Sequence, residues 1–179
     1  MFKIILLIAI VAFVIYLTNY NKFKRLENAM DEAFSVMDIH MQKRFDLIPN
    51  LLATVKGYAK YEAETLEKVV SLRNSAVTLE DKAAAEGEIG KAVRGLLAVA
   101  ESYPELKADS QFLNLQQTLS KEEDDIANAR KYFNATVKEY NDAISVMPGA
   151  LIANSMGLSK RPMWTIDDDE ARKNVKVEF

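Results

Sequence analysis

Residues 37–58 read MDIHMQKRFDLIPNLLATVKGY and lie in the longest amphipathic stretch of the chain. The stretch contains the single histidine, His40, and a proline, Pro49, where a helix seldom accepts one. Apolar residues within it and before it recur in steps of three and four, which indicates one face of a helix. They are Phe23, Leu26, Met30, Phe34, Met37, Met41, Phe45, Ile48, Leu52 and Val55.

The phase of this apolar stripe does not change at Pro49. A proline inside a helix removes a backbone hydrogen bond and costs about 3 kcal/mol, but a reversal of the chain would shift the phase. We therefore expect one long helix with a kink at Pro49, in preference to two helices joined by a tight turn. The stripe continues at Ala59, Ala63, Leu66 and Val69. We expect the helix to end between residues 73 and 77.

Several short motifs resemble those of LemA family proteins. The most specific is KRFDLIPNL at residues 43–51, followed by VKGY at residues 55–58 and by Glu62. Others are Tyr20-Asn21, Pro104–Ala108, Ala129-Arg130, Phe133-Asn134 and Tyr140-Asn141. The resemblance covers nearly the whole chain. It implies a membrane-anchored helical bundle, assigns it no biochemical activity and supplies no catalytic residues. Trp164 departs from the family pattern, in which paired phenylalanines are common, and Asn174 stands where a proline is expected.

The N-terminal segment is apolar without interruption from Ile4 to Leu17. Twenty residues at about 1.5 Å each span about 30 Å, which is enough to cross a bilayer. A cleaved signal peptide would require small residues at its exit, and residues 16–20 read YLTNY instead. We therefore expect a transmembrane anchor at residues 1–20, a helical bundle at residues 21–157 and a mobile C-terminal tail at residues 158–179.

Aromatic and basic residues follow the apolar segment, as is typical of a membrane interface. The interface anchors that we expect are Tyr16, Tyr20, Lys22, Lys24 and Arg25. Three cations on this side face two on the other, Lys3 and the amino terminus, and this bias favours a bundle on the cytoplasmic side of the cell membrane. The pattern leaves two alternatives for residues 18–21: a continuous helix or a flexible joint.

Two further helices are indicated after the first. Thr78 and Asp81 have the spacing of a capping box, and a second helix is expected at residues 79–101. Gly87 and Gly90 in this helix indicate either a close approach between helices or a weak helix. The third helix has its own stripe: Leu115, Leu119, Glu122, Ile126, Ala129, Phe133, Val137, Tyr140, Ile144 and Met147. Pro148-Gly149 should stop it, and residues 150–156 should form a short fourth helix.

Both long stripes advance by 3.5 to 3.6 residues per step, which suits long helices that wrap with a slight left-handed twist, as in a coiled coil. The predicted fold is therefore all-α: an antiparallel up-and-down bundle of long helices, preceded by one transmembrane helix. The length of 179 residues suits one domain and a tail. Because the chain has no cysteine and no long basic stretch, we expect no disulfide, no thiolate metal site and no binding to nucleic acid.

His40 and Lys43 have a spacing found in phosphotransfer modules, but Arg44 follows where such a module needs a glycine. A di-iron centre requires Glu-x-x-His on two helices, and the chain has one histidine. The methionines of the first stripe are interpreted as core residues. The acidic run at residues 167–170 lacks the spacing of a calcium loop and is interpreted as solvated. We expect no metal and no cofactor.

The best candidate for a polar contact surface is the set Lys43, Arg44, Asp46 and Asn50. Together these features predict a membrane-anchored helical scaffold or assembly protein without catalytic activity. Its expected partners are membrane lipid and further copies of the same chain, with any other protein partner unidentified. Two alternatives stay open: a phosphotransfer signalling module based on His40, and a lipid-binding or membrane-shaping homo-oligomer.

Overall fold

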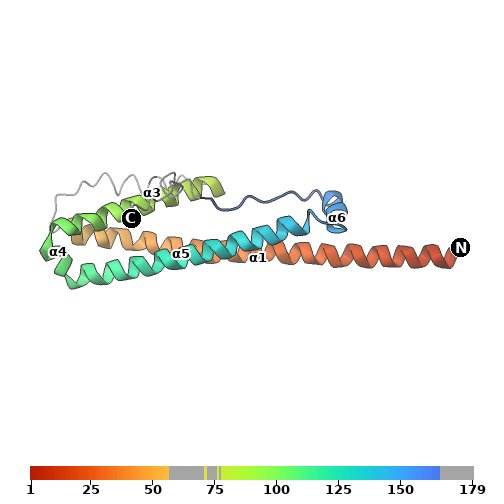
Figure 1. Cartoon of the computed structure of the whole chain (residues 1–179), viewed down its shortest axis with the longest axis horizontal. Coiled ribbons are helices and arrows are strands. Elements are labelled where there is room, and N and C mark those ends of the chain that lie inside the picture. Colours follow the sequence, from red (N-terminus) through yellow and green to blue (C-terminus); the bar gives the residue numbers. More distant parts are fainter. Residues whose placement is uncertain (57–70, 72–75, 77, 166–179) are drawn as a thin grey trace, which may run out of the picture. The chain divides into compact units, whose positions relative to one another are not determined.

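The computed structural model describes residues 1–56, 71, 76 and 78–165. This part of the chain is helical, with no strand among the described residues, and the predicted all-α fold is confirmed (Figure 1). Its elements are α1 (Phe2–Lys56), α3 (Leu79–Val99), the 3₁₀ helix η1 (Ala100–Ser102), α4 (Pro104–Ala108), α5 (Ser110–Ala143) and α6 (Gly149–Ser155).

Helix α1 is continuous both at Pro49 and at residues 18–21, the two places where the sequence allowed an interruption. It includes Pro49, so the chain does not reverse there, and the prediction of one helix is confirmed as far as Lys56. It also includes residues 18–21, which excludes a non-helical joint. The hydroxyl of Thr18 donates to the carbonyl oxygen of Val14 over 2.9 Å, within the helix. The kink at Pro49 stays a prediction, and the expected continuation of the helix to residues 73–77 lies largely outside the described residues.

Helix α3 begins at the cap that the sequence predicts. The Asp81 amide donates to the Thr78 hydroxyl oxygen, and the Thr78 amide donates to the Asp81 carboxylate, each over 3.0 Å. These reciprocal bonds satisfy donors that the first turn of a helix leaves unpaired. Gly90 of this helix is buried, and a Cβ there would lie 3.5 Å from the Arg94 guanidinium. Pro104 then takes the first position of α4, where its missing amide costs nothing.

Helix α5 ends earlier than the stripe predicts. It stops at Ala143, whereas the sequence pattern continued to Met147, which is 69 % exposed. Gly149 explains the difference. A Cβ at Gly149 would lie 2.3 Å from the carbonyl oxygen of Ala143, so only glycine permits this close return of the chain. The short fourth helix, α6, is confirmed and begins at this glycine.

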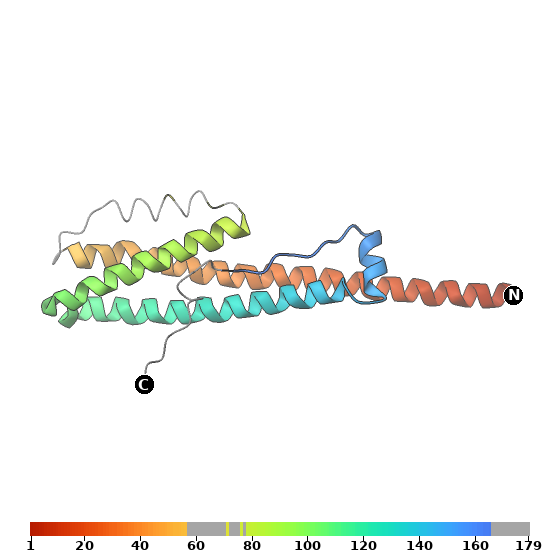
Figure 2. The ribbon, with the colours of Figure 1, turned by 45° about the horizontal axis from the view of Figure 1, so that its top comes forward.

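The described chain divides into two compact units, and α1 and α5 each contribute to both. The first unit contains Met1–Asp38 and Ala127–Met163. Here α5 runs antiparallel to α1, with the rings of Phe34 and Phe133 5.8 Å apart, and α6 lies beside α1 (Figure 2). The described part of the predicted tail, residues 158–165, is tied to α5: Asn141 bonds the backbone of Arg161 through both its amide atoms, at 2.8 and 2.9 Å.

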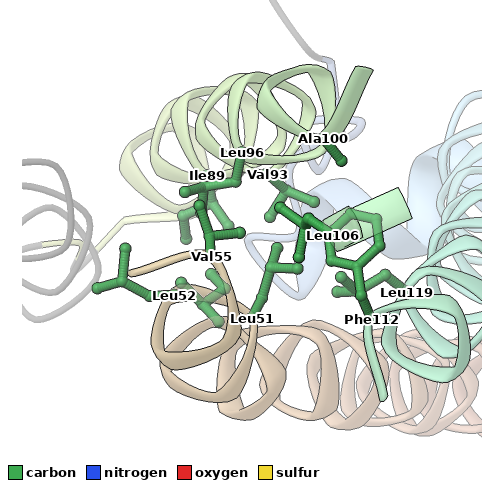
Figure 3. Close-up of a cluster of buried hydrophobic side chains, with 11 residues drawn as sticks. Leu51, Leu52, Val55, Ile89, Val93, Leu96, Ala100, Leu106, Phe112 and Leu119 are labelled. Atoms are coloured by element: carbon green, nitrogen blue, oxygen red, sulfur yellow. The ribbon is translucent and has the colours of Figure 1, made fainter. Parts of the chain in front are cut away.

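The described residues of the second unit are 39–56, 71, 76, 78–126, 164 and 165. Its apolar cluster joins side chains of α1, α3, η1, α4 and α5 (Figure 3). The buried members are Ile48, Leu51, Leu52, Val55, Ile89, Val93, Leu96, Ala100, Leu106, Phe112 and Leu119. Phe45, which belongs to the predicted stripe, is only partly buried and packs against this cluster. The boundaries predicted for anchor, bundle and tail (1–20, 21–157 and 158–179) stay a prediction, although Trp164 is only 4 % exposed.

Candidate functional site

The second unit contains a set of charged and polar side chains that connects its helices, called the polar layer below. Its members are His40, Arg44, Glu86, Glu122, Glu123 and Asp125. Arg44 of α1 pairs with two of the other helices. Arg44 occupies an inward position of α1 between the buried Met41 and Ile48, and it is 3 % exposed. Its guanidinium forms an ion pair with Glu86 of α3 and a second one with Glu123 of α5. One buried cation therefore links three helices.

The hydrogen bonds of Arg44 are directional. Nη1 donates to a carboxylate oxygen of Glu123 over 2.5 Å, and Nη2 donates to a carboxylate oxygen of Glu86. The third nitrogen, Nε, is buried without a hydrogen-bond partner among the described residues. A buried donor in this state costs about 1–3 kcal/mol, and the two charged pairs offset that cost. A Cβ at Gly90 would lie 3.9 Å from Arg44 Nη1, an ordinary van der Waals separation, so Gly90 of α3 lies beside the guanidinium.

His40 lies one turn before Arg44 on α1 and pairs with α5. Its Nδ1 is 2.8 Å from a carboxylate oxygen of Glu122 and 3.8 Å from one of Asp125. Glu122 is one of the stripe positions that the sequence predicts, and it is buried with 8 % exposure. Glu122 and Asp125 are three residues apart on a helix, so both carboxylates lie on the face of α5 that meets His40.

These three side chains have donor atoms suited to a divalent metal ion. One nitrogen of His40 and one oxygen each of Glu122 and Asp125 lie within 4.8 Å of one another. No metal ligand was predicted among these residues, and nothing in their spacing along the chain indicates that they meet. A hydrogen bond between His40 Nδ1 and the Glu122 carboxylate, with Asp125 close by, accounts for the same geometry, and His40 contributes the set's only nitrogen ligand. The arrangement therefore fits a structural cross-link between α1 and α5 without requiring an ion.

The predicted polar contact surface is only partly on the surface. Lys43, Asp46 and Asn50 are exposed, and Asp46 accepts a hydrogen bond from Gln42 over 2.6 Å. Arg44, the fourth member, is buried in the bundle, so the prediction that it belongs to an exposed contact surface is wrong. The reason is helical geometry: Arg44 follows Lys43 by 100° around the helix and shares the face of Met41 and Ile48. The exposed three stay a prediction.

The predicted membrane-interface anchors all lie on one continuous helix. The rings of Tyr16 and Tyr20 stack with centroids 6.3 Å apart, and Lys22 and Arg25 are exposed. Lys24 forms an ion pair with Glu27 at 2.7 Å, and the hydrogen bond and charge of Glu27 raise the pKa of Lys24. Their position in a membrane interface stays a prediction.

Sequence reasoning missed most acidic members of the polar layer. Glu86, Glu123 and Asp125 were not singled out, because acidic residues on a helix are usually solvated. One signal was available: residues 122–125 read EEDD, and a four-residue acidic run on a helix must place at least one carboxylate near the buried face. No pattern in the neighbouring sequence indicated which basic residue would pair with that carboxylate.

The fold and the polar layer define a class: an all-α protein in which a candidate membrane-spanning helix continues into a helical bundle. That N-terminal helix is long and apolar enough to cross a membrane, a property that a signal sequence shares. The chain belongs to the LemA family, whose family model matches residues 33–179. The resemblance seen in the sequence is thereby confirmed.

Individual relatives agree with this assignment. The chain is 26 % identical to Protein LemA of Metamycoplasma hominis over 158 residues, which cover 86 % of this chain and 72 % of the relative. It is 24 % identical to Magnetosome protein MamQ of Magnetospirillum gryphiswaldense over 191 residues, covering 88 % and 70 %. Magnetosome protein MamQ 2 of Paramagnetospirillum magneticum is 25 % identical over 187 residues, covering 88 % and 69 %. None of these names is that of an enzyme.

Proposed function

We propose that this chain is a single-pass protein of the cell membrane whose helical bundle acts as a non-catalytic scaffold or assembly unit at the membrane surface. Helix α1 carries the proposal. Every residue from Met1 to Leu17 is exposed, although nearly all are apolar, and the same helix then supplies Phe23 and Met37 to the buried core. An exposed apolar segment of this length is stable in a bilayer and not in water.

The polar layer supports a structural role over a catalytic one. It brings together one guanidinium, one imidazole and four carboxylates, and these groups are paired with one another across helices. Such pairs specify which helices meet and in which register, and a scaffold needs this specification more than it needs a reactive group. A catalytic site, in contrast, usually places an acid, base or nucleophile where a substrate can reach it.

The phosphotransfer alternative has less support. A phosphoryl group on His40 would lie against Glu122 and Asp125, whose carboxylates repel it. Incubation of the intact protein with a labelled phosphodonor tests this alternative. We expect no phosphohistidine on the wild-type chain; a band that His40→Ala removes would favour the phosphotransfer module.

Self-association is the second part of the proposal. Large apolar side chains remain exposed on the bundle, among them Val36, which is 41 % exposed on α1 of the first unit. Neighbouring copies, aligned by their anchors, would bury such residues. We expect light scattering of the intact protein in several mild detergents to give a mass above that of one chain. Val36→Asp should lower that mass, and the adjacent exposed Ser35→Asp should not. A monomer in all detergents would contradict self-association.

The membrane side of the bundle is the third part. The absence of cysteine allows single-cysteine labelling with a membrane-impermeant reagent. Ser120→Cys on α5 and Ser159→Cys after α6 should stay unlabelled in intact cells and react after lysis. Phe2→Cys, at the opposite end of the anchor, should react in intact cells. The reverse pattern would place the bundle outside the cytoplasm.

A further inference from the structure

The stretch from the last residue of α5 to Ser159 is the longest run without a charged residue after the N-terminal anchor. Residues 143–159 read AISVMPGALIANSMGLS and contain no Asp, Glu, Lys or Arg. Charged residues make up 27 % of the chain, so a stretch of this length would carry about 4 or 5 on average. The segment includes the turn after α5 and the whole of α6.

Three large apolar side chains of this segment are well exposed, although Ile144 is buried and Ile152 is half-buried. Val146, Met147 and Leu151 are 59 %, 69 % and 63 % exposed, whereas Ala153 and Gly149 are buried. α6 therefore packs on the bundle through Gly149 and Ala153 and presents Leu151 outward, with Ile152 half-buried. Concentrated exposure of this kind marks a surface that contacts something apolar.

The position of the segment indicates what it contacts. Gly149 packs against Phe23 of α1: a Cβ on Gly149 would lie 3.4 Å from the ring atom Cζ of Phe23. Figure 2 shows α6 beside α1. Phe23 follows Tyr20, the end of the apolar anchor, by three residues, which is about 4.5 Å along a helix. The uncharged segment therefore lies at the level where α1 would leave the bilayer.

Basic residues flank the exposed apolar side chains. Lys22 and Arg25 are exposed on α1, and Lys160 and Arg161 are exposed directly after the segment. Asn141 donates to the carbonyl oxygen of Arg161 and accepts from its amide, and these two hydrogen bonds hold the last two cations near the end of α5. Apolar side chains with basic residues at their border are typical of segments that lie in the headgroup region of a membrane.

We propose that the turn after α5 and helix α6 form a second membrane contact, in which Val146, Met147 and Leu151 enter the interfacial region of the bilayer that holds α1, and the flanking basic residues meet anionic headgroups. This inference rests on the proposed anchoring of α1. It adds that the bundle lies against the lipid surface at a defined face. The partner is lipid and not a soluble protein, because the anchor brings the bilayer to this face.

Depth-dependent quenching in vesicles tests the contact. The intact chain, which lacks cysteine, is reconstituted in phosphatidylcholine with and without phosphatidylglycerol. An environment-sensitive fluorophore is attached to Met147→Cys or Leu151→Cys. Ala135→Cys, exposed on α5 about 12 Å before its last residue, is the solvent control, and Phe13→Cys is the anchor control. Lipids carrying a nitroxide near the headgroup or deep in the acyl chain are the quenchers.

We expect shallow nitroxides to quench the fluorophore at residues 147 and 151 at least about twofold more than at residue 135, as for an interfacial segment. Anionic lipid should increase this quenching. Strong quenching at residue 13 with equal quenching at residues 135, 147 and 151 would overturn the second contact and leave the anchor standing. No quenching at residue 13 would overturn the anchor, and this inference with it. Circular dichroism confirms that each variant is folded.

Discussion

Two neighbouring regions of the second unit are held together by different forces. The apolar cluster around Leu51 and Phe112 is stabilised by the removal of apolar surface from water, which has no preferred direction. The polar layer around Arg44 depends on hydrogen bonds with fixed partners on two other helices. The apolar cluster therefore supplies stability, and the polar layer specifies which helices meet.

Phe112→Ala should have the largest effect. Phe112 is 2 % exposed in the apolar cluster, and removing a buried ring costs about 3–5 kcal/mol. The free energy of unfolding is measured by denaturant titration of the intact protein in detergent. The matched control is the next residue, Leu113→Ala, which is 41 % exposed and should cost about 0.5 kcal/mol or less. Equal effects of the two substitutions would mean that the cluster is not the core.

Arg44→Met should have the next largest effect and tests the polar layer. It removes the guanidinium that pairs with the Glu86 carboxylate, which is 11 % exposed, whereas Glu123 is 55 % exposed and regains water. We expect a loss of about 2–3 kcal/mol, below the 3–5 kcal/mol of a fully buried pair. Adding Glu86→Gln to Arg44→Met should recover part of it.

The control for Arg44 is its exposed neighbour. Lys43→Met removes the same charge outside the layer and should change the free energy of unfolding by about 0.5 kcal/mol or less. If Arg44→Met by itself raised the free energy of unfolding, the polar layer would destabilise the folded bundle. That result would contradict the loss expected from removing Arg44.

Pro49→Ala changes a residue of α1 that lies between Arg44 of the polar layer and Leu51 of the apolar cluster. Alanine restores a backbone donor and is intrinsically about 3 kcal/mol better than proline in a helix, but it also frees the unfolded chain, which costs about 0.4–1 kcal/mol. Because Pro49 is exposed, we expect a net gain of about 2 kcal/mol. Asn50→Ala, which restores no donor, should gain about 0.5 kcal/mol. A sharp fall of both helicity and melting temperature would show that packing needs a bend at Pro49.

Thr78→Ala should have the smallest effect and lies in neither region. It removes the hydroxyl that accepts from the Asp81 amide, and the loss of such a cap costs about 1 kcal/mol. Thr78→Ser keeps the acceptor and should cost a few tenths of a kcal/mol at most. Equal losses in the two variants would show that the threonine methyl group matters more than the cap.

The helices and their buried faces were largely predictable from the sequence. The steps of three and four identified most of the buried residues of α1 and α5, and the cap at Thr78 was read directly. The main errors lay at the end of α5 and at Arg44. The stripe alone could not show that Gly149 returns to Ala143. Arg44 was grouped with exposed neighbours because charged residues are rarely buried unless they are paired, and its partners lie far away in sequence.

By itself, the sequence determined the apolar segment that begins α1, the phase of the long stripes and the start of α3. These features depend on residues within a few positions of one another, and the repeating geometry of a helix converts such spacing directly into a face. Only the tertiary structure decided that Arg44 meets Glu86 and Glu123, that His40 meets Glu122, and that α6 lies beside Phe23. Those pairings join residues from 42 to 126 positions apart, and they depend on how whole helices are placed against each other, which no local pattern encodes.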